Sequence, residues 1–174
     1  MKTIILPGYS EHNRKWVMEV AEKIDVDHEV KPVLWDHWTD KSIGFSIEEK
    51  VEKVINLAGS DKINLIAKSI GTLVTALLIS RIPQEIERVI LCGIPLKDIT
   101  PQQIIFYREA LPTFPSEKII CFQNRNDPHG SYKEIDAFIR SINPAISLVE
   151  KLRNDHEYPY FGEFQGFLSQ DGQI

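Results

Sequence analysis

A serine, an aspartate and a histidine each follow an apolar run of strand type, in that order along the 174-residue chain. The residues are Ser69, Asp127 and His156, and the runs before them span 62–67, 118–122 and 146–152. A serine hydroxyl becomes a nucleophile when a histidine accepts its proton and a carboxylate orients that histidine. The residue types, their order and their shared position after strands predict a catalytic triad, with Ser69 as nucleophile, Asp127 as acid and His156 as base.

Ser69 lies in the pentapeptide AKSIG, between the most apolar strand and the most apolar helix of the sequence. A tight turn of this kind, a nucleophile elbow, strains the serine backbone and exposes its hydroxyl above the sheet. It requires small residues two before and two after the serine, which Ala67 and Gly71 supply. The N–H of Ile70 would lie at a helix N-terminus and face developing negative charge. The pentapeptide alone is equally typical of a serine that caps a helix, and Lys68 is expected to be a solvated charge.

The acid and the base each have a competitor. Asp155 directly precedes His156, but a neighbour in sequence seldom folds back to reach the ring nitrogen, which favours Asp127. His129 shares a loop with Asp127 and is better placed as a pocket or turn residue than as the base. In the absence of catalysis, Asp127 would be a turn former before Pro128 and His156 an exposed loop histidine.

Six short β-branched runs alternate with longer segments of helical period. The expected strands span 3–6, 29–35, 62–67, 88–93, 118–122 and 146–152, and the expected helices 11–24, 46–57, 70–82, 132–142 and 157–168. Each crossover is too long for a hairpin, so the strands should form a parallel sheet with helices on both faces. Ligands bind such sheets outside the carboxyl ends of the strands, which is where the three triad residues stand.

Composition and length bound the class of protein. The length fits one domain over residues 1–174, and 43% hydrophobic with 26% charged residues is ordinary globular usage. A net charge of −5 offers no general basic surface for nucleic acid or an anionic membrane. No apolar run approaches the roughly 20 residues that span a bilayer, and the opening residues do not resemble a signal peptide. We therefore expect a cytoplasmic protein in which Cys92 and Cys121 are buried free thiols.

With these residues in place, the chain resembles α/β-hydrolases, specifically the small lidless single-domain kind that includes the retinoblastoma-binding serine hydrolase family. The resemblance covers nearly the whole chain. It rests on the opening strand with Pro7-Gly8, the serine turn, the acid loop QNRNDPHGSYKEI and the late histidine in RNDHEYP. It departs from the family pattern where Ala67 replaces the usual glycine and where Pro7 stands in place of a histidine.

The resemblance implies a minimal α/β-hydrolase fold: three layers, with a six-stranded, mostly parallel sheet flanked by helices on both faces. The strand before Ser69 would be central, and the family's first two strands would be missing. Carried over by position, it implies the same triad of Ser69, Asp127 and His156. It also implies that the N–H of Tyr9 joins the N–H of Ile70 in an oxyanion hole.

Aromatic and imidazole side chains near the strand ends are the candidates for a substrate pocket. Trp35, His37 and Trp38 follow the second strand, where they would either wall a pocket or cover the core, and His129 is a fourth candidate. The apolar segment 98–115 is the expected partial cover of the site. The histidines match no metal-binding spacing, so we expect neither a metal nor another cofactor.

The residues predict a serine hydrolase that cleaves a small ester, thioester or amide through an acyl-enzyme. The alternative is a non-catalytic or weakly active binding or regulatory protein on the same scaffold, because a fold does not imply an activity. A nucleotide-binding protein is excluded by the lack of GxGxxG and GxxxxGK[ST] motifs after the strands. The expected partner is a small-molecule substrate, and a protein partner is left open.

Overall fold

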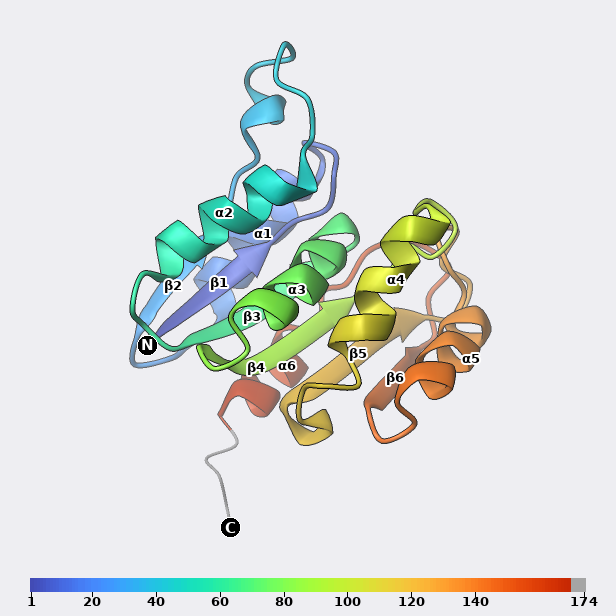
Figure 1. The fold of residues 1–174 in the computed structure, drawn as a ribbon. Coiled ribbons are helices and arrows are strands. Elements are labelled where there is room, and N and C mark those ends of the chain that lie inside the picture. Colours follow the sequence, from blue (N-terminus) through green and yellow to red (C-terminus); the bar gives the residue numbers. More distant parts are fainter. Residues whose placement is uncertain (170–174) are drawn as a thin grey trace.

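The computed structural model describes residues 1–169, in which six strands form one parallel sheet in the order β2-β1-β3-β4-β5-β6 (Figure 1). The strands are β1 (Lys2–Leu6), β2 (Glu29–Pro32), β3 (Ile63–Lys68), β4 (Ile86–Cys92), β5 (Ile119–Asn124) and β6 (Ser147–Lys151). The predicted parallel α/β sheet with the serine strand in the interior is confirmed.

Helices cover both faces of the sheet and bury a separate hydrophobic cluster on each (Figure 1). One face carries α1 (Asn13–Lys23) and α6 (Phe161–Leu168). The other face carries α2 (Ile47–Ala58), α3 (Ile70–Arg81), α4 (Pro101–Ala110) and α5 (Tyr132–Ile142). Two short 3-10 turns, η1 (Asp36–Trp38) and η2 (Ser116–Lys118), complete the described elements. The segment between η1 and α2 projects beyond the end of the sheet (Figure 1).

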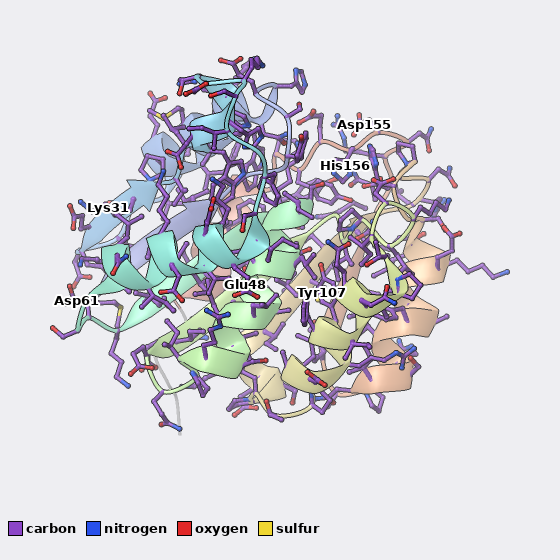
Figure 2. The ribbon with its side chains drawn as sticks, turned by 45° about the horizontal axis from the view of Figure 1, so that its top comes forward. Lys31, Glu48, Asp61, Tyr107, Asp155 and His156 are labelled. Carbon is purple, nitrogen blue, oxygen red and sulfur yellow. The ribbon has the colours of Figure 1, made fainter. Side chains whose placement is uncertain are left out.

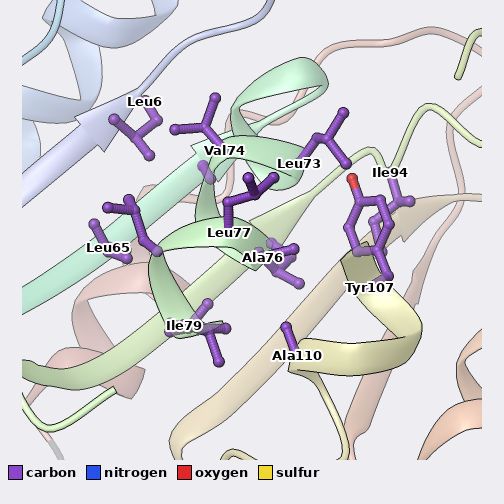
Figure 3. Close-up of a cluster of buried hydrophobic side chains, with 14 of the residues drawn as sticks. Leu6, Leu65, Leu73, Val74, Ala76, Leu77, Ile79, Ile94, Tyr107 and Ala110 are labelled. Carbon is purple, nitrogen blue, oxygen red and sulfur yellow. The ribbon is translucent and has the colours of Figure 1, made fainter. Parts of the chain in front are cut away.

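The centre of the fold is the pair of elements that flank Ser69. All six residues of β3 are buried, as expected for a parallel strand covered on both faces. α3 is apolar on nearly every side because it packs on β3 and between α2 and α4 (Figure 3). Tyr107 of α4 reaches α3, where its hydroxyl lies 2.6 Å from Thr72 Oγ1. The serine turn is therefore embedded in the most rigidly packed part of the molecule.

Three elements differ from the sequence prediction. β2 ends at Pro32 rather than at residue 35, because its pairing with β1 stops there and residues 33–35 lead to η1 as irregular backbone. The final helix begins at Phe161 rather than at residue 157. Helix α4 was expected only as a cover segment, although Thr100 and Gln103 form a complete capping box and Pro101 stands at its first position.

Two expectations on burial and membranes can be compared with the structure. Cys92 and Cys121 are free and buried, and burial raises the pKa of the Cys121 thiol to about 12. Within residues 1–169, none of the helices has the length and apolar character needed to cross a bilayer.

Candidate active site

Ser69 occupies a strained turn between β3 and α3. It is the only non-glycine residue in 1–169 with a positive φ, at 55°, a conformation that costs about 1–3 kcal/mol. Its N–H donates to the carbonyl of Cys92 at 2.9 Å, and its own carbonyl accepts from the N–H of Thr72 at 2.8 Å. Its side chain makes no capping hydrogen bond to α3. Helix capping therefore does not account for the serine or for its strained backbone.

The small residues around Ser69 are required by the closeness of strand β1. A Cβ on Gly71 would lie 2.6 Å from the carbonyl oxygen of Leu6 and 2.9 Å from that of Pro7, distances that real Cβ atoms do not tolerate. Ala67 is fully buried at the other end of the turn. The backbone of β1, in addition to β3 and α3, therefore limits the side chain at position 71.

Asp127 and His156 form a hydrogen-bonded pair on the loops that follow β5 and β6. Asp127 Oδ2 lies 2.7 Å from His156 Nδ1, and the carboxylate is almost completely buried, at 1% exposure. Asp155 does not contact the imidazole in this way, since its carboxylate binds the Arg153 guanidinium at 2.6 and 3.0 Å. Figure 2 shows Asp155 and His156 on the same loop at the end of the sheet. Of the two aspartates, Asp127 is the one placed to orient the ring.

The second ring nitrogen of His156 is available for proton transfer. Because a carboxylate only accepts, Nδ1 carries the proton and the lone pair is on Nε2. Nε2 is buried and has no hydrogen bond partner within residues 1–169. The ring lies against Gly93, where a Cβ would come 2.8 Å from His156 Cε1, and Gly93 directly follows the carbonyl that binds the Ser69 N–H. The imidazole and the serine turn therefore meet at the end of β4.

A polar network that the sequence analysis missed holds the acid and the histidine loop. The Tyr158 hydroxyl donates to Asp127 Oδ2 at 2.5 Å, and the His129 N–H donates to Oδ1 at 2.8 Å. Burial, followed by the charge of Asp127, raises the pKa of Tyr158 well above its usual value, so the hydroxyl stays a donor. The Asn124 amide donates to the carbonyls of Asp155 and Glu157 at 2.8 and 2.9 Å. In the sequence, the only indication of this network was the position of Asn124 shortly after the end of a predicted strand.

The two residues expected to supply the oxyanion hole, Tyr9 and Ile70, lie on the cavity side of the serine. Ile70 is the first residue of α3, where an N–H has no helical acceptor. Tyr9 is held through its carbonyl, which accepts from His37 Nε2 at 2.8 Å and from Trp38 Nε1 at 2.7 Å. Tyr9, Ile70 and Ser69 line one cavity of about 400 Å³. The residues expected to supply the oxyanion hole and the nucleophile thus share one cavity.

The lining of this cavity differs from the predicted pocket. The lining residues are Tyr9, Phe45, Ile47, Ser69, Ile70, Pro95, Asp98 and Gln103. Trp35 is buried instead, and its indole donates to the carbonyls of Pro7 and Gly8 at 3.3 and 3.1 Å. His37 and Trp38 line a separate depression of about 230 Å³. These aromatic side chains therefore do not line the cavity beside Ser69. Their ring N–H groups donate to the backbone carbonyls of residues 7–9 and so hold the loop after β1 in place.

The surroundings of His129 and of the expected cover, segment 98–115, also differ from the prediction. The His129 ring centroid lies 4.3 Å from that of His156, and its Nδ1 pairs with Asp98, but it does not line the cavity. From the expected cover at 98–115, Asp98 and Gln103 reach the cavity. Its aromatic residues Tyr107 and Phe114 are buried in the core.

The expectation for Lys68 was wrong. The side chain is only 1% exposed, and Nζ forms an ion pair with Glu157 Oε2 at 3.0 Å. The sequence suggested a solvated charge because its partner lies 89 residues away. In residues 1–169, no group of three or more His, Cys, Asp or Glu side chains is arranged to hold a metal ion.

Comparison with known proteins identifies the fold. No protein-family model matches the sequence, and no curated protein matches it. A serine hydrolase without a lid from Xanthomonas campestris superimposes with a TM-score of 0.62 and 14% identity, over 96% of this chain and 78% of its own. An α/β-hydrolase enzyme from a Medee basin deep-sea metagenome library gives 0.67 and 16%, over 99% and 92%. An esterase from Pyrococcus furiosus gives 0.61 and 19%, over 96% and 80%.

These similarities show that the chain has the α/β-hydrolase fold in its minimal, six-stranded form. The narrower resemblance to the retinoblastoma-binding serine hydrolase family stays a prediction.

Proposed function

We propose that the protein is a serine hydrolase that cleaves a small ester, thioester or amide through an acyl-enzyme. The observation that carries this proposal is the strained backbone of Ser69, at φ 55°, together with a buried Asp127–His156 pair whose Nε2 has no hydrogen-bond partner among residues 1–169. Strain of this kind persists only where the surrounding structure enforces it, and it concentrates at active sites. The hydrolase and esterase activities of the structural neighbours are in accord with the proposal.

The residues would act in the following order. Ser69 Oγ attacks the substrate carbonyl carbon while His156 Nε2 takes its proton, and Asp127 keeps the imidazole in the required tautomer. The tetrahedral oxyanion accepts from the N–H groups of Tyr9 and Ile70. As the intermediate collapses, the bond to the leaving group breaks and His156 returns its proton to that group. Water then attacks the acyl-enzyme through the same base, which releases the acid and restores Ser69.

The cavity limits the substrate to a small molecule. Its volume is about 400 Å³, and it has apolar walls of Tyr9, Phe45, Ile47, Ile70 and Pro95 beside the polar side chains of Asp98 and Gln103. We infer that the apolar walls receive an acyl chain or an aromatic leaving group. The mechanism uses side chains, backbone N–H groups and water, and therefore requires no cofactor. A cytoplasmic location is part of the same proposal.

A fluorophosphonate probe tests the proposal, because it labels only an activated serine. The wild-type protein should be labelled and should hydrolyse p-nitrophenyl acetate. Ser69→Ala should lose both activities, by at least about 10³-fold in turnover, while unfolding as cooperatively as the wild type. A folded wild-type protein that is not labelled would favour the alternative of a non-catalytic binding protein.

A further inference from the structure

Lys68, the last residue of β3, carries a charge in an almost fully buried position. Its Nζ lies 3.0 Å from Glu157 Oε2 and 5.7 Å from the centroid of the Trp16 ring. The other carboxylate oxygen of Glu157 lies 3.2 Å from Nε2 of the exposed His12. A buried ammonium requires such a partner, since removal from water without one is very costly.

Stability is a poor explanation for this ion pair. Desolvation of a buried cation offsets most of the attraction to its partner. Replacing buried ion pairs by apolar side chains of similar size is often neutral or stabilising. Within a strand as apolar as β3, an uncharged residue at position 68 would therefore cost the fold little. The position of the pair between two segments of the chain points to a different role.

The ion pair connects the two residues that adjoin the proposed nucleophile and base. Lys68 precedes Ser69, and Glu157 follows His156. The backbone of Glu157 is itself fixed, since its N–H donates to Asp155 Oδ1 at 3.0 Å and its carbonyl accepts from the Asn124 amide. The pair thus links a rigid strand end to a loop whose backbone is already anchored, on either side of the Ser69 to His156 gap.

Trp16 of α1 supports the same arrangement. Its ring faces the Lys68 ammonium, and its indole N–H donates to the carbonyl of Tyr158 at 2.8 Å. The Tyr158 hydroxyl in turn binds Asp127. Residues 156–158 are consequently held by the acid, by Asn124 and by the strand that carries the serine.

We propose that Lys68 and Glu157 are positioning residues that set the placement of His156 relative to Ser69. This inference rests on the proposed hydrolase function. The structure has no hydrogen bond to His156 Nε2 within the described residues, so the approach of the two reacting groups depends on such external constraints. A displacement of about 1 Å in a catalytic group can reduce the rate by about 10²-fold.

The test replaces Lys68 with methionine, which has a similar shape and no charge. Lys68→Met should reduce kcat for p-nitrophenyl acetate by at least about tenfold, with KM within threefold and the melting temperature equal to or above that of the wild type. Glu157→Gln leaves the buried Lys68 charge without an opposite charge, which strongly destabilises the fold, so the single variant is not used as a test. The double variant Lys68→Met/Glu157→Gln removes both charges and should show the same kcat as Lys68→Met alone.

Lys50 provides a matched control. It is also 1% exposed, its Nζ lies 3.3 Å from Asp36 Oδ2, and it faces the Trp35 ring at 5.8 Å. Asp36 keeps Lys53 as a second partner, as Glu157 keeps His12. Lys50→Met should leave kcat within twofold of the wild type.

A spectroscopic measurement separates this inference from the proposed function. The proton on His156 Nδ1, bound to Asp127, gives an NMR resonance that reports the placement of the ring whether or not the protein is active. Lys68→Met should shift or broaden this resonance, and Lys50→Met should not. An unchanged resonance, an unchanged kcat, or equal losses in the two methionine variants would each overturn the positioning role. Failure of the fluorophosphonate test would overturn the hydrolase proposal and the effect expected on kcat, whereas the resonance would still show whether the Lys68 ion pair sets the placement of the His156 ring.

Discussion

The two sides of Ser69 are built on different principles. On the aromatic side, defined by residues 7–9 with Trp35, His37 and Trp38, the functional groups are backbone N–H groups. They are fixed indirectly, because ring N–H donors bind the carbonyls of the same loop. On the polar side, defined by Asn124, Asp127, His156 and Tyr158, the functional groups are side chains. The Asp127 carboxylate binds His156 and Tyr158 directly, and the Tyr158 hydroxyl also accepts from the backbone N–H of Asn124.

The difference has a consequence for substitution. A side chain that carries a proton or a charge in the reaction has no substitute, so its removal should abolish turnover. A ring that holds a backbone carbonyl shares its task with its neighbours, since the Tyr9 carbonyl accepts from both His37 and Trp38. We therefore expect large effects on the polar side and small effects on the aromatic side.

The largest effect is expected for the base. His156→Ala should reduce kcat/KM for p-nitrophenyl acetate by at least about 10³-fold, because it removes the proposed acceptor of the Ser69 proton. His129→Ala is the control: its ring contacts that of His156, but the N–H that binds Asp127 is retained, so the loss should stay below about tenfold. Activity should also fall in acid, since only a neutral imidazole accepts a proton. Equal losses of activity in the two variants would contradict the assignment of His156 as the base.

A smaller but still large effect is expected for the acid. Asp127→Asn keeps the shape of the side chain but favours the wrong imidazole tautomer, and should lower kcat by at least about 10²-fold. Asp155→Asn disturbs the Arg153 pair, the hydrogen bond from the Glu157 N–H and a 3.3 Å hydrogen bond from the Asn124 amide, and should cost less than about tenfold. Steady-state kinetics of the two variants decide between the carboxylates. The reverse ranking would assign the acid to Asp155.

The smallest effect is expected on the aromatic side. Trp38→Phe removes one donor to the Tyr9 carbonyl while His37 keeps the other, so kcat should fall by about two- to fivefold. The free energy of unfolding should decrease by about 1 kcal/mol, as for one hydrogen bond. Urea denaturation and ester kinetics measure both quantities. A loss comparable to that of Asp127→Asn would show that the comparison between the two sides is wrong.

The same contrast explains what could be predicted from the sequence. The parallel sheet and the pairing of Asp127 with His156 could be predicted from strand order, because both residues stand at strand ends and their side-chain types are visible in the sequence. The sequence could not show whether Trp35 and Trp38 pack in the core or donate hydrogen bonds to the loop after β1. Every residue has a backbone carbonyl, so the sequence does not indicate which carbonyls accept from these indoles. The burial of Lys68 was equally hidden, because it depends on contacts with Trp16 and Glu157, which are remote in sequence.

Part of the cavity wall comes from a different segment of the chain than the proposed catalytic residues. Phe45 comes from the projecting segment between η1 and α2, and Ile47 is the first residue of α2, while residues 39–42 of the projecting segment are exposed. None of the triad, its hydrogen-bond partners or the Lys68 ion pair lies there. Surface loops accept replacement far more readily than packed elements do. Exchange of residues 39–47 is accordingly a route by which evolution or an engineer can redirect such a scaffold to new acyl groups without rebuilding its reaction centre.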